Sequence, residues 1–227
     1  MIADEIQVVE KYPELTDSKD ETTRYIKESI INAIVPFKKS ILEINRKGKL
    51  NENKLTQIFV QCIEYQIRRL CENIAVNCQY HDIFFNTKGV PDFYFYRCEE
   101  TQKHTALFVV ESKRLPPPSK KAREKEYVIG EDNNGGIERY KIEKHGKGFC
   151  ECGMLGFVEK QTFQYWQKTI NLWIENIAKN DNNWKNDEIL KMNNYSDDYC
   201  QLSSIIHRYN SNTDITLYHW WIQCRNV

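Results

Sequence analysis

Two acidic residues and a lysine carry the clearest chemical signal in this chain. Asp92 follows a proline at the start of an aromatic-rich segment, and Glu111 and Lys113 end the apolar run 106–110. Carboxylates bind hard divalent cations such as Mg²⁺ or Mn²⁺. A bound cation polarises a phosphodiester and lowers the pKa of a water molecule, and a lysine can orient that water. The three residues therefore predict metal-dependent hydrolysis of a nucleic-acid backbone.

A hairpin of strands 92–98 and 105–113 would bring the two acids together. Its loop is centred between residues 101 and 102, so paired positions sum to 203, as 92 and 111 do. Directly opposed residues lie about 4.5–5.5 Å apart at Cβ, and two like charges that close favour a cation between them. Strand alternation places Lys113 on the same face as Glu111 and turns Ser112 away.

A third acid is expected at Glu52, at the start of a helix that runs back across the sheet. Residues 52–76 span roughly 36 Å as a helix. Residues 75–86 span about the same length as a strand. The start of the helix would therefore lie level with Asp92, whereas Glu64 would lie about halfway along. Glu52 is preferred to Glu64, which remains the alternative.

The positioning elements follow from hydrophobic periodicity and turn residues. The first three strands are expected to form an antiparallel meander, and helices should flank a mixed sheet. The 180–198 segment is polar and is expected to be a connection. The expected helices are 19–46, with a break or kink at Pro36, 52–74, 137–144 and 161–179, and the expected strands are 75–86, 92–98, 105–113, 153–158, 200–209 and 215–224.

This pattern resembles the PD-(D/E)XK nuclease superfamily over residues 50 to 180 or so. The match consists of Pro91-Asp92, Glu111-Ser112-Lys113 and, less closely, Glu52. The resemblance implies an α/β fold with a restriction-endonuclease-like mixed sheet, preceded by an N-terminal helical extension. Residues 1–48 would form the extension and residues 49–227 the nuclease-like domain. It also implies that the acids bind metal and that Lys113 serves catalysis.

A glycine-rich stretch from Gly135 to Tyr140 resembles poorly characterised bacterial relatives. Some nucleases of the superfamily place a glutamine and a tyrosine on the helix after the lysine, whereas this chain has Glu138 and Arg139 there. Arg139 could instead contact a phosphate as a bidentate donor. Lys120 and Lys121 are further candidate phosphate contacts, with an ordinary solvated loop as the alternative.

Composition sets outer limits on these expectations. The 227 residues carry no net charge, but residues 113–147 hold ten Lys/Arg against six Asp/Glu, where a polyanion would lie. The eight cysteines are expected to be reduced and mostly buried. No run approaches the roughly 20 apolar residues of a membrane span, and the start lacks the features of a secretory signal. A cytoplasmic protein is expected.

The sequence thus predicts a Mg²⁺-dependent nuclease acting on DNA, with RNA as the alternative substrate. A bacterial role in phage defence or repair and a homodimer rest on analogy alone. One alternative is a non-catalytic nucleic-acid-binding or assembly module on the same fold. Another is a toxin-like or regulatory partner that acts through the acidic N-terminal segment. The number of metal ions is left open.

Overall fold

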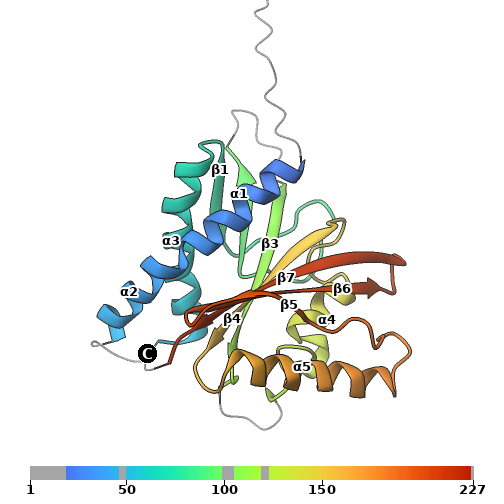
Figure 1. The fold of residues 1–227 in the computed structure, drawn as a ribbon. Coiled ribbons are helices and arrows are strands. Elements are labelled where there is room, and N and C mark those ends of the chain that lie inside the picture. The colour runs from blue at the N-terminus through green and yellow to red at the C-terminus, as the bar shows by residue number, and fades with distance from the viewer. Residues whose placement is uncertain (1–18, 46–49, 99–104, 119–122, 226–227) are drawn as a thin grey trace, which may run out of the picture.

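A computed structural model describes residues 19–45, 50–98, 105–118 and 123–225. These form an α/β fold around one seven-stranded mixed sheet with the strand order β1-β2-β3-β4-β7-β6-β5 (Figure 1). The helices are α1 (Lys19–Asn32), α2 (Ile34–Asn45), α3 (Glu52–Leu70), the short 3-10 helix η2 (Glu131–Asn133), α4 (Gly136–Lys141) and α5 (Phe163–Ala178). The strands are β1 (Ile74–Cys78), β2 (Phe93–Arg97), β3 (Ala106–Leu115), β4 (Glu151–Val158), β5 (Lys191–Tyr195), β6 (Tyr199–Arg208) and β7 (Thr213–Gln223).

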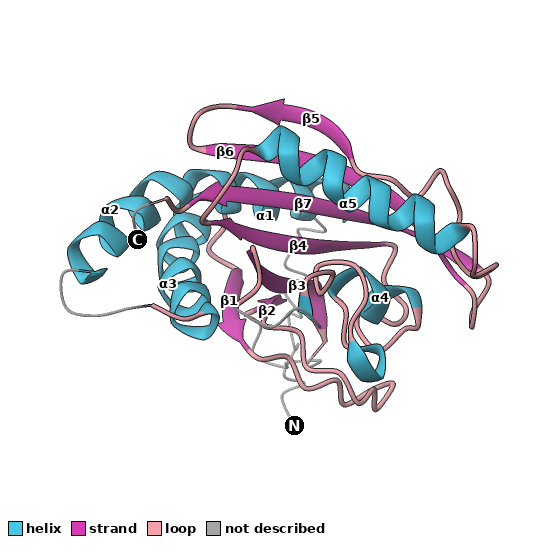
Figure 2. Ribbon diagram, turned by 90° about the horizontal axis from the view of Figure 1, so that it is seen from below, coloured by secondary structure: helices cyan, strands magenta, loops and turns pink. Residues whose placement is uncertain are grey.

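Helices cover both faces of the sheet, as expected from the sequence. Helices α1, α2 and α3 lie on one face, and α4 and α5 lie on the other (Figure 2). Side chains of β4 alternate between the two layers, so Met154 packs with α4 and α5 while Leu155 and Phe157 pack with α1 to α3. A strand buried on both faces needs apolar residues at successive positions, and β4 has them.

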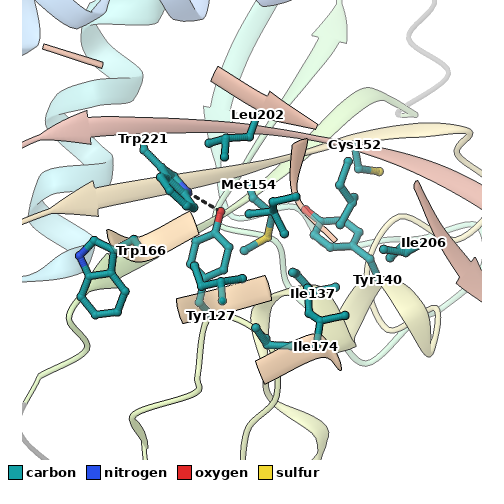
Figure 3. Close-up of a cluster of buried hydrophobic side chains, with 14 of the residues drawn as sticks. Tyr127, Ile137, Tyr140, Cys152, Met154, Trp166, Ile174, Leu202, Ile206 and Trp221 are labelled. Atoms are coloured by element: carbon teal, nitrogen blue, oxygen red, sulfur yellow. Dashed lines mark hydrogen bonds between the residues drawn. The ribbon is translucent and has the colours of Figure 1, made fainter. Parts of the chain in front are cut away.

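The core beneath α4 and α5 contains a buried polar network. Trp221 Nε1 donates to the Tyr127 hydroxyl at 2.9 Å (Figure 3). The same hydroxyl lies 2.8 Å from His219 Nδ1, and the Ser204 hydroxyl lies 3.0 Å from His219 Nε2. All four side chains are buried. Each polar group has a partner, so the network avoids the cost of an unpaired buried donor or acceptor.

The β2–β3 hairpin has the register that loop symmetry predicts. Phe93 pairs with Val110 and Phe95 pairs with Phe108, so the paired numbers sum to 203. The register shifts by one beyond Phe95, at the end nearer the loop. Strands β1, β2 and β3 form the expected antiparallel meander, and β3 then pairs parallel with β4. The hairpin therefore directs its open end toward the candidate site.

Three element predictions need correction. The first strand ends at Cys78 instead of residue 86, because Gln79 adopts a positive φ of 58° and Asp82 Oδ1 then accepts from the backbone of Phe84 and Phe85 in a turn. The first helical segment breaks at Ala33, and Pro36 lies in the first turn of α2, where its missing N–H is tolerated. Residues 191–195, expected in a connection, form the edge strand β5.

The N-terminal helices pack against the body of the fold. Residues of α1 and α2 share one hydrophobic cluster with α3 and the sheet, with Phe37 contacting Phe59 and Phe157. The division into an extension and a domain at residue 48 stays a prediction.

Among the described helices, none is both long and apolar enough to cross a membrane. None of the eight cysteines is in a disulfide, but only Cys152, Cys200 and Cys224 are buried, so the expectation of mostly buried thiols is wrong.

Candidate active site

Asp92 lies one residue before β2, directly beside the second acidic segment. Its Oδ2 accepts a hydrogen bond from the backbone N–H of Ser112 at 2.7 Å. The backbone on either side is also fixed, because Gln79 N donates to Asp92 O at 2.8 Å and Tyr80 N donates to Pro91 O at 3.1 Å. The carboxylate is therefore held at the open end of the hairpin, level with the Glu111–Lys113 segment of β3.

Glu111 and Lys113 lie on the same face of β3 and form a buried ion pair. Lys113 Nζ lies 2.5 Å from Glu111 Oε1 and donates to the carbonyl of Ser112 at 3.0 Å. The exposed fractions of the two side chains are 1% for Glu111 and 7% for Lys113. The expected alternation along the strand is confirmed. A buried charge needs such a partner, because an isolated one loses its hydration energy.

Glu52 opens α3 and reaches the same end of β3. Its Oε2 accepts from the backbone N–H of Arg114 at 2.9 Å, and Asn51 caps the helix by accepting from Lys54 N. Glu64, the alternative third acid, instead forms an ion pair with Arg68 at 2.5 Å on the exposed side of the helix. The structure thus brings Glu52, and not Glu64, close to the other two acids.

Arg139 of α4 contacts the site from the opposite side. Its Nη1 pairs with Glu111 Oε1, the oxygen that also pairs with Lys113. The N–H groups of residues 136–138 donate to the carbonyls of residues 126–128 at 2.9–3.1 Å, which docks the helix start. A Cβ on Gly136 would lie 2.9 Å from the backbone oxygen of Tyr127, so a larger residue would force the helix start away. The glycine-rich stretch therefore allows the close packing that brings Arg139 to Glu111.

His145 also lies at the site, next to the second oxygen of Glu111. Its Nδ1 lies 3.5 Å from Glu111 Oε2, and its side chain is 1% exposed. Neither ring nitrogen has a hydrogen-bond partner in the described part of the chain, and neither does Glu111 Oε2. A Cβ on Gly89 would lie 2.3 Å from His145 Cδ2, so the Gly89 turn packs directly against the ring.

Burial and neighbouring charges separate the acid pKa values. Burial, helped by the negative charge of Glu111, raises the pKa of Asp92 to about 8. Burial also raises the pKa of Glu52. Burial opposes ionisation of Glu111 as well, but the positive charges of Lys113 and Arg139 outweigh it and lower the pKa of Glu111. Burial likewise lowers the pKa of His145 to about 4, so the ring is neutral at pH 7 and adds no charge.

The donor set fits a magnesium-type ion with few protein ligands. No group of three or more His, Cys, Asp or Glu side chains within the described ranges is arranged to hold a metal ion. Glu52 as a metal ligand therefore stays a prediction. Mg²⁺ commonly uses one or two carboxylates and keeps several waters. Glu111 Oε2 is a buried acceptor without a hydrogen bond, and the Asp92 carboxylate is close enough to Glu111 for their charges to interact, so these two carboxylates match that requirement.

The positions of two predicted phosphate-contacting residues relative to the site are not described. Lys120 and Lys121 lie outside the described residues.

Searches against protein-family models, curated proteins and solved structures found no match to this chain. The resemblance to PD-(D/E)XK nucleases therefore stays a prediction that rests on the motif residues and their geometry.

Proposed function

We propose that this protein is a Mg²⁺- or Mn²⁺-dependent nuclease that hydrolyses phosphodiester bonds of DNA, on a restriction-endonuclease-like fold. The observation that carries the proposal is the convergence of Asp92, Glu111 and Lys113 at the open end of one hairpin. The order of α3, three antiparallel strands and a fourth strand parallel to β3 agrees with that fold.

In this reaction the acidic side chains would bind the cation and the basic side chains would position the water and the other groups. Asp92 and the free oxygen of Glu111 would hold the cation, and the second oxygen of Glu111 is already held by Lys113 and Arg139. The cation, when bound, would supply Lewis-acid polarisation of the phosphate and a water of lowered pKa. The Lys113 ammonium would position that water and offset negative charge that develops on the phosphate. Arg139 would fix the orientation of Glu111, and its role as a phosphate contact is a second proposal.

One observation favours a different function on the same fold, a nucleic-acid-binding or assembly module that does not cut. Glu111 already pairs with two cations, and no cluster of three metal ligands is formed among the described residues. Buried ion pairs of this kind also occur for purely structural reasons. Cleavage and metal binding separate the two functions.

The test is cleavage of labelled single-stranded and duplex DNA by the wild type and Asp92→Asn in Mg²⁺, with EDTA controls. Asn keeps the size of Asp92 and can still accept from Ser112 N, so the variant should fold. We expect the variant to lose at least 100-fold in rate, because a metal ligand is removed. Equal rates for the two proteins, or equal rates with and without EDTA, would refute the proposed reaction.

A further inference from the structure

A polar groove of about 500 Å³ lies between α3 and the end of edge strand β1, and Asp92 forms part of its wall. The groove is separate from the contacts that hold Glu111, yet it reaches one of the proposed metal ligands. Figure 1 shows α3 running alongside β1, the edge strand of the sheet, and residues of both elements line the groove. A ligand in the groove would place one end at the proposed reaction centre.

Carboxamide side chains dominate the groove. Asn53, Gln57 and Gln61 are exposed on successive turns of α3, and Asn77 and Gln79 are exposed at the end of β1. Residues four apart share one helix face, so the three α3 amides form a continuous row. A carboxamide both donates and accepts hydrogen bonds, as the edges of nucleobases do. The row can therefore form hydrogen bonds with the edge of a nucleobase, without selecting one base over another.

A buried hydroxyl supplies a second, independent indication of a ligand. Thr56 lines the same groove, its side chain is only 4% exposed, and its Oγ1 has no hydrogen-bond partner among the described residues. Buried polar groups are nearly always paired, because an unpaired one has lost its hydrogen bonds to water without replacing them. A bound group that hydrogen-bonds to Thr56 would remove this cost.

The charge of the groove indicates which part of a nucleic acid it would hold. Its described lining contains the acids Glu64 and Asp92 but no lysine or arginine. Phosphate groups are bound mainly by Lys and Arg, so this lining disfavours the backbone. Its volume lies within the roughly 300–1,000 Å³ of small-ligand sites, which suits one or two nucleotides. A duplex keeps its bases stacked and paired, whereas single strands present unstacked base edges.

We propose that this groove binds the unpaired bases of a single-stranded nucleic acid, next to the phosphodiester that reaches Asp92. The inference rests on the proposed function for the class of ligand, and it specifies that substrate as single-stranded. Base contacts to neutral amides carry affinity without counterion release, so they leave the salt dependence of binding unchanged.

The test measures binding of a labelled eight-nucleotide DNA single strand and its duplex by fluorescence anisotropy, in EDTA, so that no metal-dependent cleavage occurs. The test variant is Gln57→Met/Gln61→Met, since methionine keeps the length of glutamine and a high helix propensity. The matched control is Gln66→Met, on the same helix outside the groove. We expect the wild type and the control to bind the single strand at least tenfold more tightly than the duplex.

The double variant should lose about 30-fold in single-strand affinity, as two hydrogen bonds of about 1 kcal/mol each would give, with an unchanged salt slope. Wild-type affinity for the double variant, an equal loss in the control, a preference for duplex, or no binding would each overturn the groove assignment. Groove-dependent binding without Mg²⁺-dependent cleavage would support this inference while refuting the proposed reaction.

Discussion

Lys113 Nζ lies 2.5 Å from Glu111 Oε1 in a site where both side chains are almost fully buried. Arg139 contacts the same oxygen from α4, so one carboxylate oxygen joins β3 to the helix packed against it (Figure 2). The other oxygen, Oε2, has no hydrogen bond among the described residues. The two oxygens of Glu111 thus have different surroundings, since one is paired with two cationic side chains and the other is buried without a hydrogen bond.

Replacing Lys113 by methionine should destabilise the protein by about 3 kcal/mol, because removing one partner leaves a buried charge poorly compensated. Arg139→Met should cost less, since the Arg139 side chain is 22% exposed and water can replace part of its contact. Urea unfolding of both variants at pH 7 measures the difference. An equal or greater loss for Arg139→Met would contradict this order.

Asp92→Asn should stabilise the metal-free protein at pH 7 to 8. The pKa of Asp92 is raised from 3.8 to about 8 in the folded state, so its contribution is complete below pH 3.8 and is lost as the pH rises through 8. Asparagine does not ionise and escapes this loss, which amounts to at most about 1.4 kcal/mol per pH unit. Unfolding in EDTA at pH 5 and pH 8 tests the prediction, and a variant less stable than the wild type at pH 8 would contradict it.

Gly136→Ala should weaken the docking of α4. The new Cβ would lie 2.5 Å from Met154 Cε and 2.9 Å from Tyr127 O. Overpacking of this kind typically costs about 1–3 kcal/mol. The shift of α4 should also separate Arg139 from Glu111, so we expect lower unfolding free energy and lower cleavage rate together. A variant with wild-type stability would show that the helix start has more room than the structure indicates.

The buried His219 should make stability fall in mild acid. Burial lowers its pKa from 6.5 to about 3, so below pH 6.5 the unfolded chain takes up a proton that the folded chain does not. The unfolding free energy should therefore fall by up to about 1.4 kcal/mol per pH unit between pH 6.5 and 3 through this residue. His219→Gln should show a shallower decline between pH 6.5 and 5 by urea unfolding, and an unchanged slope would argue against a neutral buried ring.

Local rules predicted the hairpin that forms the candidate site. The register from Phe93 to Phe95 follows from loop symmetry, and it fails only at the shift beyond Phe95. The approach of Glu52 to β3 was predicted from matched lengths, although both elements are shorter than expected. The strand was overestimated by much more than the helix, so the matched lengths do not explain why Glu52 reaches β3.

Other features depend on contacts that no local pattern encodes. Strand β5 is polar and largely exposed, and its Asn residues have low strand propensity, so only pairing with β6 defines it. The contact of Arg139 with Glu111 requires α4 to dock on the 126–128 carbonyls. Arg139 and the glycine-rich stretch were recognisable in the sequence, but the contact with Glu111 was not, because it depends on the close approach of α4 that Gly136 allows.

The central claim is that Asp92 and Glu111 together hold a divalent cation. Anomalous diffraction from a wild-type crystal soaked in Mn²⁺ at pH 8, where more of Asp92 is ionised, tests it most directly. The account predicts a manganese peak between the Asp92 carboxylate and Glu111 Oε2, about 2.0–2.2 Å from each oxygen, as expected for hard cations of this size. A peak elsewhere, or no peak at saturating Mn²⁺, would contradict it.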